Sequence, residues 1–144
     1  MAKRLDVDLK VTRLLLEVGL MGVVVKNVDE GETIIRCIQK FRDDVPHPNT
    51  VMAAALIYQN RLADAIAELE GALKRFPNHQ LGKSLLAVAC ANDGRRGWQA
   101  LCKEVIDDGR DEWAIQLARE TLGYDYRRSQ APAAGAPRTT HVFA

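Results

Sequence analysis

The feature that most constrains this chain is a set of small residues that recur every 34 positions. Gly19, Ala53 and Ala87 are each separated by 34 residues. Such a period is typical of repeat proteins, in which each repeat is one small helical unit that stacks on the next. Small residues in the first helix of a unit let the second helix approach closely. The same spacing holds for Val18, Met52 and Leu86, for Gly22, Leu56 and Cys90, and for the pairs Gly31 and Ala65, Ile35 and Leu69, and Ile38 and Ala72.

The clearest helical pattern lies in residues 61–78. Ala65, Leu69 and Ala72 are spaced by three or four residues, so they share one face of an α-helix. Pro77 ends this helix because proline cannot continue the hydrogen-bond ladder. Comparable patterns predict seven helices in all, at about 8–25, 29–42, 51–59, 61–76, 79–91, 98–108 and 111–122, with a loop over 43–50. In the last helix, the residues expected to face inward are Trp113, Ile115, Leu117, Ala118 and Leu122.

Composition favours one soluble all-α domain. A chain of 144 residues suits a single domain, and 47% hydrophobic with 27% charged residues is ordinary for a soluble protein. The net charge of +1 argues against nucleic acid as the main partner, because phosphate binding needs a basic surplus. We predict three stacked helix hairpins and a C-terminal capping helix over 8–123, between a polar lead-in (1–7) and a disordered Pro/Ala/Arg-rich tail (124–144). A helical bundle with a chance period is the alternative.

No residue pattern indicates catalysis, a cofactor or a metal site. The chain has no HExxH, P-loop or GxGxxG motif, and none of its three histidines has a nucleophile arrangement beside it. Cys37, Cys90 and Cys102 lack metal-type spacing and fall within apolar helical stretches, so buried, reduced thiols are expected. No signal-peptide or membrane-spanning pattern is present, and the cytosol is the simplest location.

The repeat resembles the tetratricopeptide repeat. The middle unit fits best, although Asn49 stands where that repeat places an aromatic residue. The first unit ends in Asp43 rather than proline, and the second helix of the third unit slips by one residue, with Trp98 in place of a small residue. The residues that match the pattern in the middle unit are Met52, Ala53, Leu56, Ala65, Leu69, Ala72 and Pro77.

A narrower resemblance covers about residues 8–123. The segments LLLEVGLMG, ADAIAELEGAL and LGKSLLAVACANDG are similar to small chaperones of bacterial type III secretion systems of the YscG/PscG type. Residues 94–123 are most similar to HrpK-type proteins of plant-associated systems. The first resemblance implies a cytoplasmic chaperone that holds a needle subunit, without membrane or nucleic-acid binding. The second implies a structural or assembly component of a secretion system, and a generic tetratricopeptide adaptor is a third possibility.

Two surfaces follow as candidate partner sites. The YscG/PscG resemblance implies a second small helical protein on the N-terminal helices, and 14–25, which is apolar on nearly all sides, is the candidate for it. In stacked repeats the first helices line the inner surface, where an apolar groove suits the apolar face of a helix. These positions could instead be ordinary core. The expected partner-binding residues are Leu16, Leu20, Val23, Val24, Thr50, Ala54, Ile57, Tyr58, Ser84, Val88 and Ala91.

Overall fold

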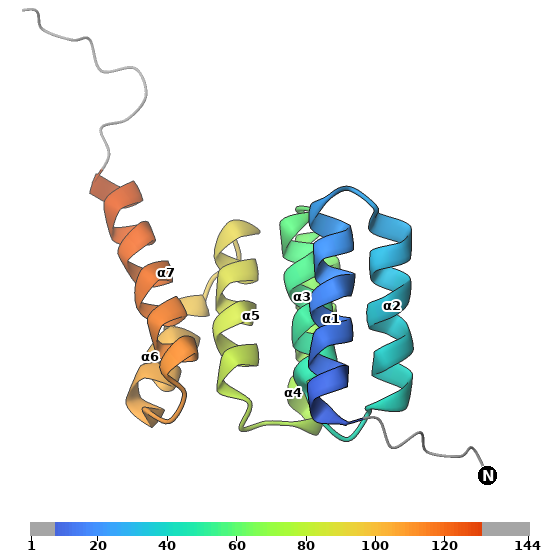
Figure 1. The fold of residues 1–144 in the computed structure, drawn as a ribbon. Coiled ribbons are helices and arrows are strands. Elements are labelled where there is room, and N and C mark those ends of the chain that lie inside the picture. The colour runs from blue at the N-terminus through green and yellow to red at the C-terminus, as the bar shows by residue number, and fades with distance from the viewer. Residues whose placement is uncertain (1–7, 131–144) are drawn as a thin grey trace, which may run out of the picture.

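The computed structural model describes residues 8–130, and within them the fold is all-α, as predicted. Seven helices follow one another without a strand in the described part of the chain (Figure 1). Their bounds are α1 (Leu9–Val24), α2 (Val28–Phe41), α3 (His47–Tyr58), α4 (Leu62–Arg75), α5 (Gln80–Asn92), α6 (Trp98–Asp108) and α7 (Glu112–Gln130).

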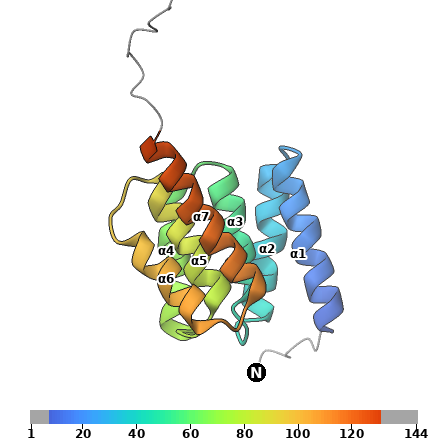
Figure 2. The ribbon, with the colours of Figure 1, turned by 90° about the vertical axis from the view of Figure 1, so that its left-hand side faces the viewer.

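The helices form three successive hairpins and a terminal helix. The hairpins are α1–α2, α3–α4 and α5–α6. Each hairpin packs on the next, because α3 contacts both α1 and α2, and α5 contacts both α3 and α4. Helix α7 packs on α5 and α6, across which it lies in Figure 2, so it covers the C-terminal end of the stack.

The turns inside the hairpins repeat with the same period as the small residues. Lys26, Asn60 and Gly94 lie 34 residues apart, and all three adopt a left-handed backbone with φ of 68°, 59° and 71°. The next amide in each turn donates to a carbonyl in the last turn of the first helix: Asn27 N to Gly22 O at 2.8 Å, Arg61 N to Leu56 O at 2.9 Å and Arg95 N to Cys90 O at 2.9 Å. This pattern ends each first helix in the same way, so the three units share backbone geometry as well as sequence.

Small residues lie where the two helices of a hairpin touch. A Cβ on Gly31 would be only 2.5 Å from the carbonyl oxygen of Gly19 and 2.7 Å from the amide nitrogen of Val23. The backbones of α1 and α2 are therefore in direct contact. In the later hairpins Ala53, Ala65 and Ala87 are fully buried, as expected from their place in the repeat.

The core forms two clusters. The first runs through the first two hairpins into α5 and is built on large side chains such as Leu16, Ile35, Leu56 and Leu69. The second joins α5, α6 and α7 and contains Ala87, Trp98, Cys102, Val105, Ala114 and Ala118.

Several sequence-based boundaries and facings were wrong. Helix α3 begins at His47 rather than Val51, because Pro48 sits in the first turn, where a missing amide donor does no harm. Helix α7 continues to Gln130 and includes the first residues of the predicted tail, since no proline interrupts the chain before Pro132. Trp113 is 77% exposed because it lies off the stripe of Ala114 and Ala118 that faces the core. The expectations for 1–7 and 131–144 lie outside the described residues.

Candidate protein-binding groove

Four of the eleven expected partner-binding residues are buried in the core. Leu16 and Val23 are each 1% exposed, Thr50 is 5% exposed and Ser84 is fully buried. Thr50 and Ser84 make hydrogen bonds inside the protein: the Ser84 hydroxyl donates to the carbonyl oxygen of Ala114 in α7 at 2.7 Å. These four side chains face neighbouring helices of the stack, so the ordinary-core alternative holds for them. They support a surface rather than form it.

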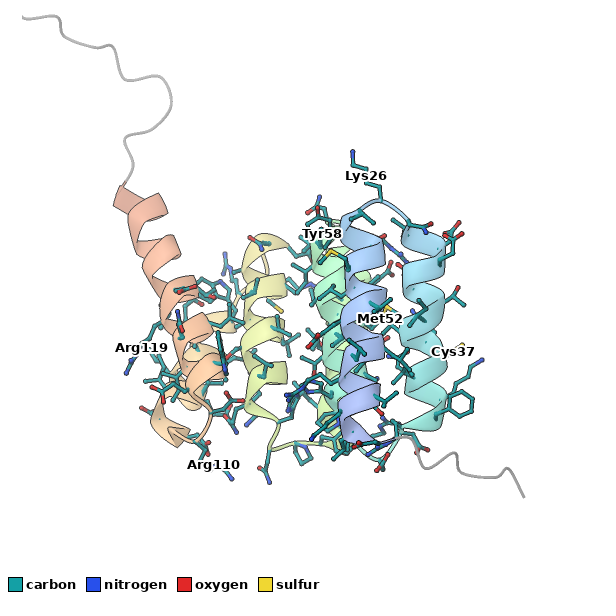
Figure 3. All side chains as sticks on the ribbon, viewed as in Figure 1. Lys26, Cys37, Met52, Tyr58, Arg110 and Arg119 are labelled. Carbon is teal, nitrogen blue, oxygen red and sulfur yellow. The ribbon has the colours of Figure 1, made fainter. Side chains whose placement is uncertain are left out.

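The other seven positions remain accessible. They come from α1, α3 and α5, and α3 contacts both of the other two helices. The hydroxyl of Tyr58 donates to the carbonyl oxygen of Val24 at 3.4 Å, which links the end of α3 to the end of α1. Figure 3 shows Tyr58 close to the α1–α2 turn, which carries Lys26. We call these seven the first-helix surface: Val24 and Tyr58 are exposed, and Leu20, Ala54, Ile57, Val88 and Ala91 are half-buried.

A cleft between α1 and the start of α3 adjoins the first-helix surface. One cavity of about 610 Å³ lies between the N-terminal half of α1 and residues 45–47, and a smaller one of about 80 Å³ reaches Leu20 and Val51. Arg13, Glu17 and His47 line both cavities. None of these three polar residues was among the expected site residues, although Arg13 and His47 are 34 residues apart and occupy equivalent positions in their repeats.

The outward face of α1 is a second apolar surface. Seven of the ten exposed large hydrophobic side chains in the described part of the chain lie between Leu9 and Val25. Five of them recur at alternating intervals of three and four residues, and we call them the α1 stripe. The stripe consists of Val11 (45% exposed), Leu14 (58%), Val18 (49%), Met21 (60%) and Val25 (64%).

The cysteines are free thiols in three different environments. None of the three takes part in a disulfide within the described residues. Cys37 is exposed rather than buried and points outward from α2 (Figure 3), because it lies off the stripe of Ile35 and Ile38. Cys102 is buried in the second core cluster, and this burial raises the pKa of its thiol to about 11. Cys102 is therefore protonated and inert near neutral pH.

His79 links the second and third hairpins through a hydrogen bond to α3. Its Nε2 lies 2.8 Å from the Thr50 hydroxyl oxygen, which donates to the carbonyl oxygen of Pro46 and so accepts from the ring. Burial lowers the pKa of His79 below its ordinary value of 6.5, and nearby His47 lowers it further, while Asp111 acts in the opposite direction. Between that lowered pKa and 6.5 the unfolded chain binds more protons than the folded one, so folding is weakened there.

We therefore expect the free energy of unfolding to fall as the pH drops below about 6.5, whereas the contribution of His79 is complete above that value. Urea unfolding between pH 5 and pH 7.5 measures this dependence. His79→Gln keeps a donor for Thr50 but does not titrate, so the slope should become shallower. An unchanged slope in that variant would assign the dependence to other groups.

Comparison with known proteins identifies the family. A model of the family described as bacterial type III secretion protein (HrpB1_HrpK) matches residues 2–125, which is nearly the whole chain. The chain belongs to the HrpB1_HrpK family. This agrees with the resemblance to type III secretion proteins seen in the sequence. No curated protein matches the chain.

The fold of this HrpB1_HrpK member is tetratricopeptide-like. The crystal structure of the Sgt2 TPR domain from Aspergillus fumigatus is similar, with a TM-score of 0.62 over 91% of each chain. The two sequences are only 15% identical, so the similarity concerns the fold alone. The family and the fold are of a non-enzymatic kind. Within residues 8–130, no helix is both long and apolar enough to cross a bilayer, and no three metal-ligating side chains gather at one point.

Proposed function

We propose that this protein is a bacterial cytoplasmic chaperone that binds the needle subunit of a type III secretion system. The first-helix surface would hold the amphipathic C-terminal helix of that subunit and so prevent premature polymerisation. The observation that carries the proposal is the chemistry of the surface: seven accessible side chains on three neighbouring helices, none of them charged. Membership of the HrpB1_HrpK family supports a role in type III secretion.

An amphipathic helix suits this surface better than an extended charged peptide. Such a helix presents anchors at intervals of three and four residues, which bury apolar area in a groove between helices. On this surface Leu20, Ala54 and Ile57 are half-buried, whereas Val24 and Tyr58 are exposed. Covering this residual apolar area removes it from water, which favours the complex against the entropy lost on association.

The cleft beside the surface gives the bound helix a preferred direction. Lys10, Arg13 and His47 line it near the N-terminal ends of α1 and α3, with Glu17 in the middle of α1, whereas Val24 and Tyr58 mark the C-terminal ends of those helices. A helix with an apolar end and a charged end would place the charged end over the cleft. Only a helix with this polarity makes both sets of contacts at once.

The variant Ile57→Asp tests this binding site. An aspartate at this half-buried position would lie unpaired beneath the bound helix, which costs at least about 1.5 kcal/mol of binding, or tenfold in affinity. Affinity for the needle subunit encoded with this protein can be measured by titration calorimetry, and circular dichroism reports helicity. Ala67→Asp, at an exposed position of α4, is the matched control and should bind normally. If Ile57→Asp loses helicity in parallel with binding, Ile57 belongs to the core and not to the site.

The family assignment also favours a second candidate, a structural or assembly component of the secretion apparatus. HrpK-type resemblance over 94–123 and the HrpB1_HrpK match are the observations in its favour. Cell fractionation separates the two, because a chaperone stays in the cytoplasm with its subunit, whereas an assembly component co-purifies with the apparatus.

A further inference from the structure

The α1 stripe has the spacing of a coiled-coil seam. Val11, Val18 and Val25 are seven residues apart, and Leu14 and Met21 fall between them at the heptad positions conventionally labelled d, with the valines at a. All five side chains are exposed in the monomer. We propose that two copies of this chain pair through α1 in a parallel, two-stranded coiled coil. The pairing does not depend on the proposed chaperone function.

The stripe faces away from the protein that carries it. Leu16 and Val23, which are each 1% exposed, project from the side of α1 nearly opposite Val18, since residues two and five positions away lie across a helix. Packing against α2 and α3 holds α1 in its helical form without a partner. A seam of two heptads is short for an isolated coiled coil, but here the helix is already formed, so pairing does not have to supply the cost of ordering it.

The residue types select a parallel pair. β-Branched residues at a with leucine-like residues at d favour two parallel strands, and the stripe has valine at each a position with Leu14 and Met21 at d. The flanks agree. In a parallel pair Lys10 would face Leu15 of the other copy, and Glu17 would face Gly22, so no like charges meet. An antiparallel pair would bring the two Glu17 edges together.

The ends of the repeat stack argue for a second copy as the occupant. The C-terminal end is covered by α7, whereas the N-terminal end presents the α1 stripe with Phe41 of α2, 45% exposed, on the same hairpin. Repeat stacks normally need a polar cap at each end to stay soluble. Two identical uncapped ends that meet about a two-fold axis cover each other and leave no open apolar end for further growth.

The oligomeric state of the full chain tests the pairing. Sedimentation equilibrium should show a dimer that dissociates at micromolar concentrations. Val18→Glu, at the centre of the stripe, should raise the dissociation constant at least about tenfold, which corresponds to 1.4 kcal/mol, while circular dichroism stays unchanged. Trp113→Glu, at a more exposed apolar position outside the stripe, is the matched control and should remain dimeric.

Cysteine cross-linking then tests the direction of the pair. In a Cys37→Ser background, which removes the exposed native thiol, Val11→Cys and Val18→Cys should each form a covalent dimer on mild oxidation. In an antiparallel pair the two Val11 positions lie far beyond disulfide reach. A chain that stays monomeric at about 100 µM, well above the micromolar dissociation constant expected for the dimer, overturns the proposal. A dimer that survives Val18→Glu also overturns it. A dimer without a cross-link at Val11 overturns the parallel arrangement, and a monomer whose stripe binds only another protein overturns the choice of a second copy.

Discussion

Replacing Gly31 with alanine is expected to destabilise the protein by about 3 kcal/mol, the upper part of the range for overpacked sites. The new methyl group would lie 2.5 Å from the carbonyl oxygen of Gly19 and 2.7 Å from the amide nitrogen of Val23. Both are backbone atoms of α1, so no side chain can rotate away to make room. Helices α1 and α2 must move apart, which disturbs the packing of Ile35 and Leu16 beneath them.

Gly71 provides the control for this prediction. It lies inside α4, and a methyl group at this position would have no neighbour within 4 Å. Gly71→Ala should therefore stabilise the protein by about 0.5–1 kcal/mol through helix propensity alone. Urea unfolding of both variants measures the difference. Equal effects at the two positions would mean that the first hairpin is not packed backbone to backbone.

The two tryptophans should differ sharply when each is replaced by alanine. Trp98 is 6% exposed and packs in the second core cluster with Cys102 and Val105. Trp98→Ala should cost about 3–5 kcal/mol, because it removes a large buried side chain and leaves a cavity. The loss should appear as a lower urea midpoint and as exposure of the Cys102 thiol to a labelling reagent.

Trp113→Ala is the matched change at the surface. Trp113 is 77% exposed, so its removal should change the free energy of unfolding by no more than about 0.5 kcal/mol. The wild-type side chain should also emit at longer wavelength than Trp98, since water surrounds most of its ring. A large loss of stability on Trp113→Ala would show that α7 is packed differently from the structure described above.

The repeat architecture could be predicted because it follows from residue types at regular positions in the sequence. Small residues at intervals of 34 mark close helix contacts, and the left-handed turns at Lys26, Asn60 and Gly94 follow the same interval. The prolines predicted helix boundaries less reliably. Pro77 lies just beyond the end of α4 as expected, whereas Pro48 lies in the first turn of α3 instead of in a loop, because proline is tolerated there.

The candidate groove was harder to predict because accessibility depends on how neighbouring hairpins pack. Leu16, Thr50 and Ser84 occupy the same position in successive repeats, and all three are covered by an adjacent helix. Repeat periodicity gives the direction in which a side chain points but not the distance to the next helix. Leu20, Ala54 and Val88 share the next inward-facing position and remain half-exposed. The polar cleft at Arg13 and His47 could not be predicted in the same way, because it forms only where the start of α3 packs beside α1.

Co-expression with the needle subunit of the same secretion system is the measurement that tests the central claim most directly. We expect a soluble complex in which the subunit stays monomeric, and we expect fibres to form when the subunit is expressed alone. Removing the C-terminal helix of the subunit should abolish the complex. If the subunit polymerises equally in the presence and absence of this protein, and the two do not co-purify, the first-helix surface is not a chaperone site for that subunit.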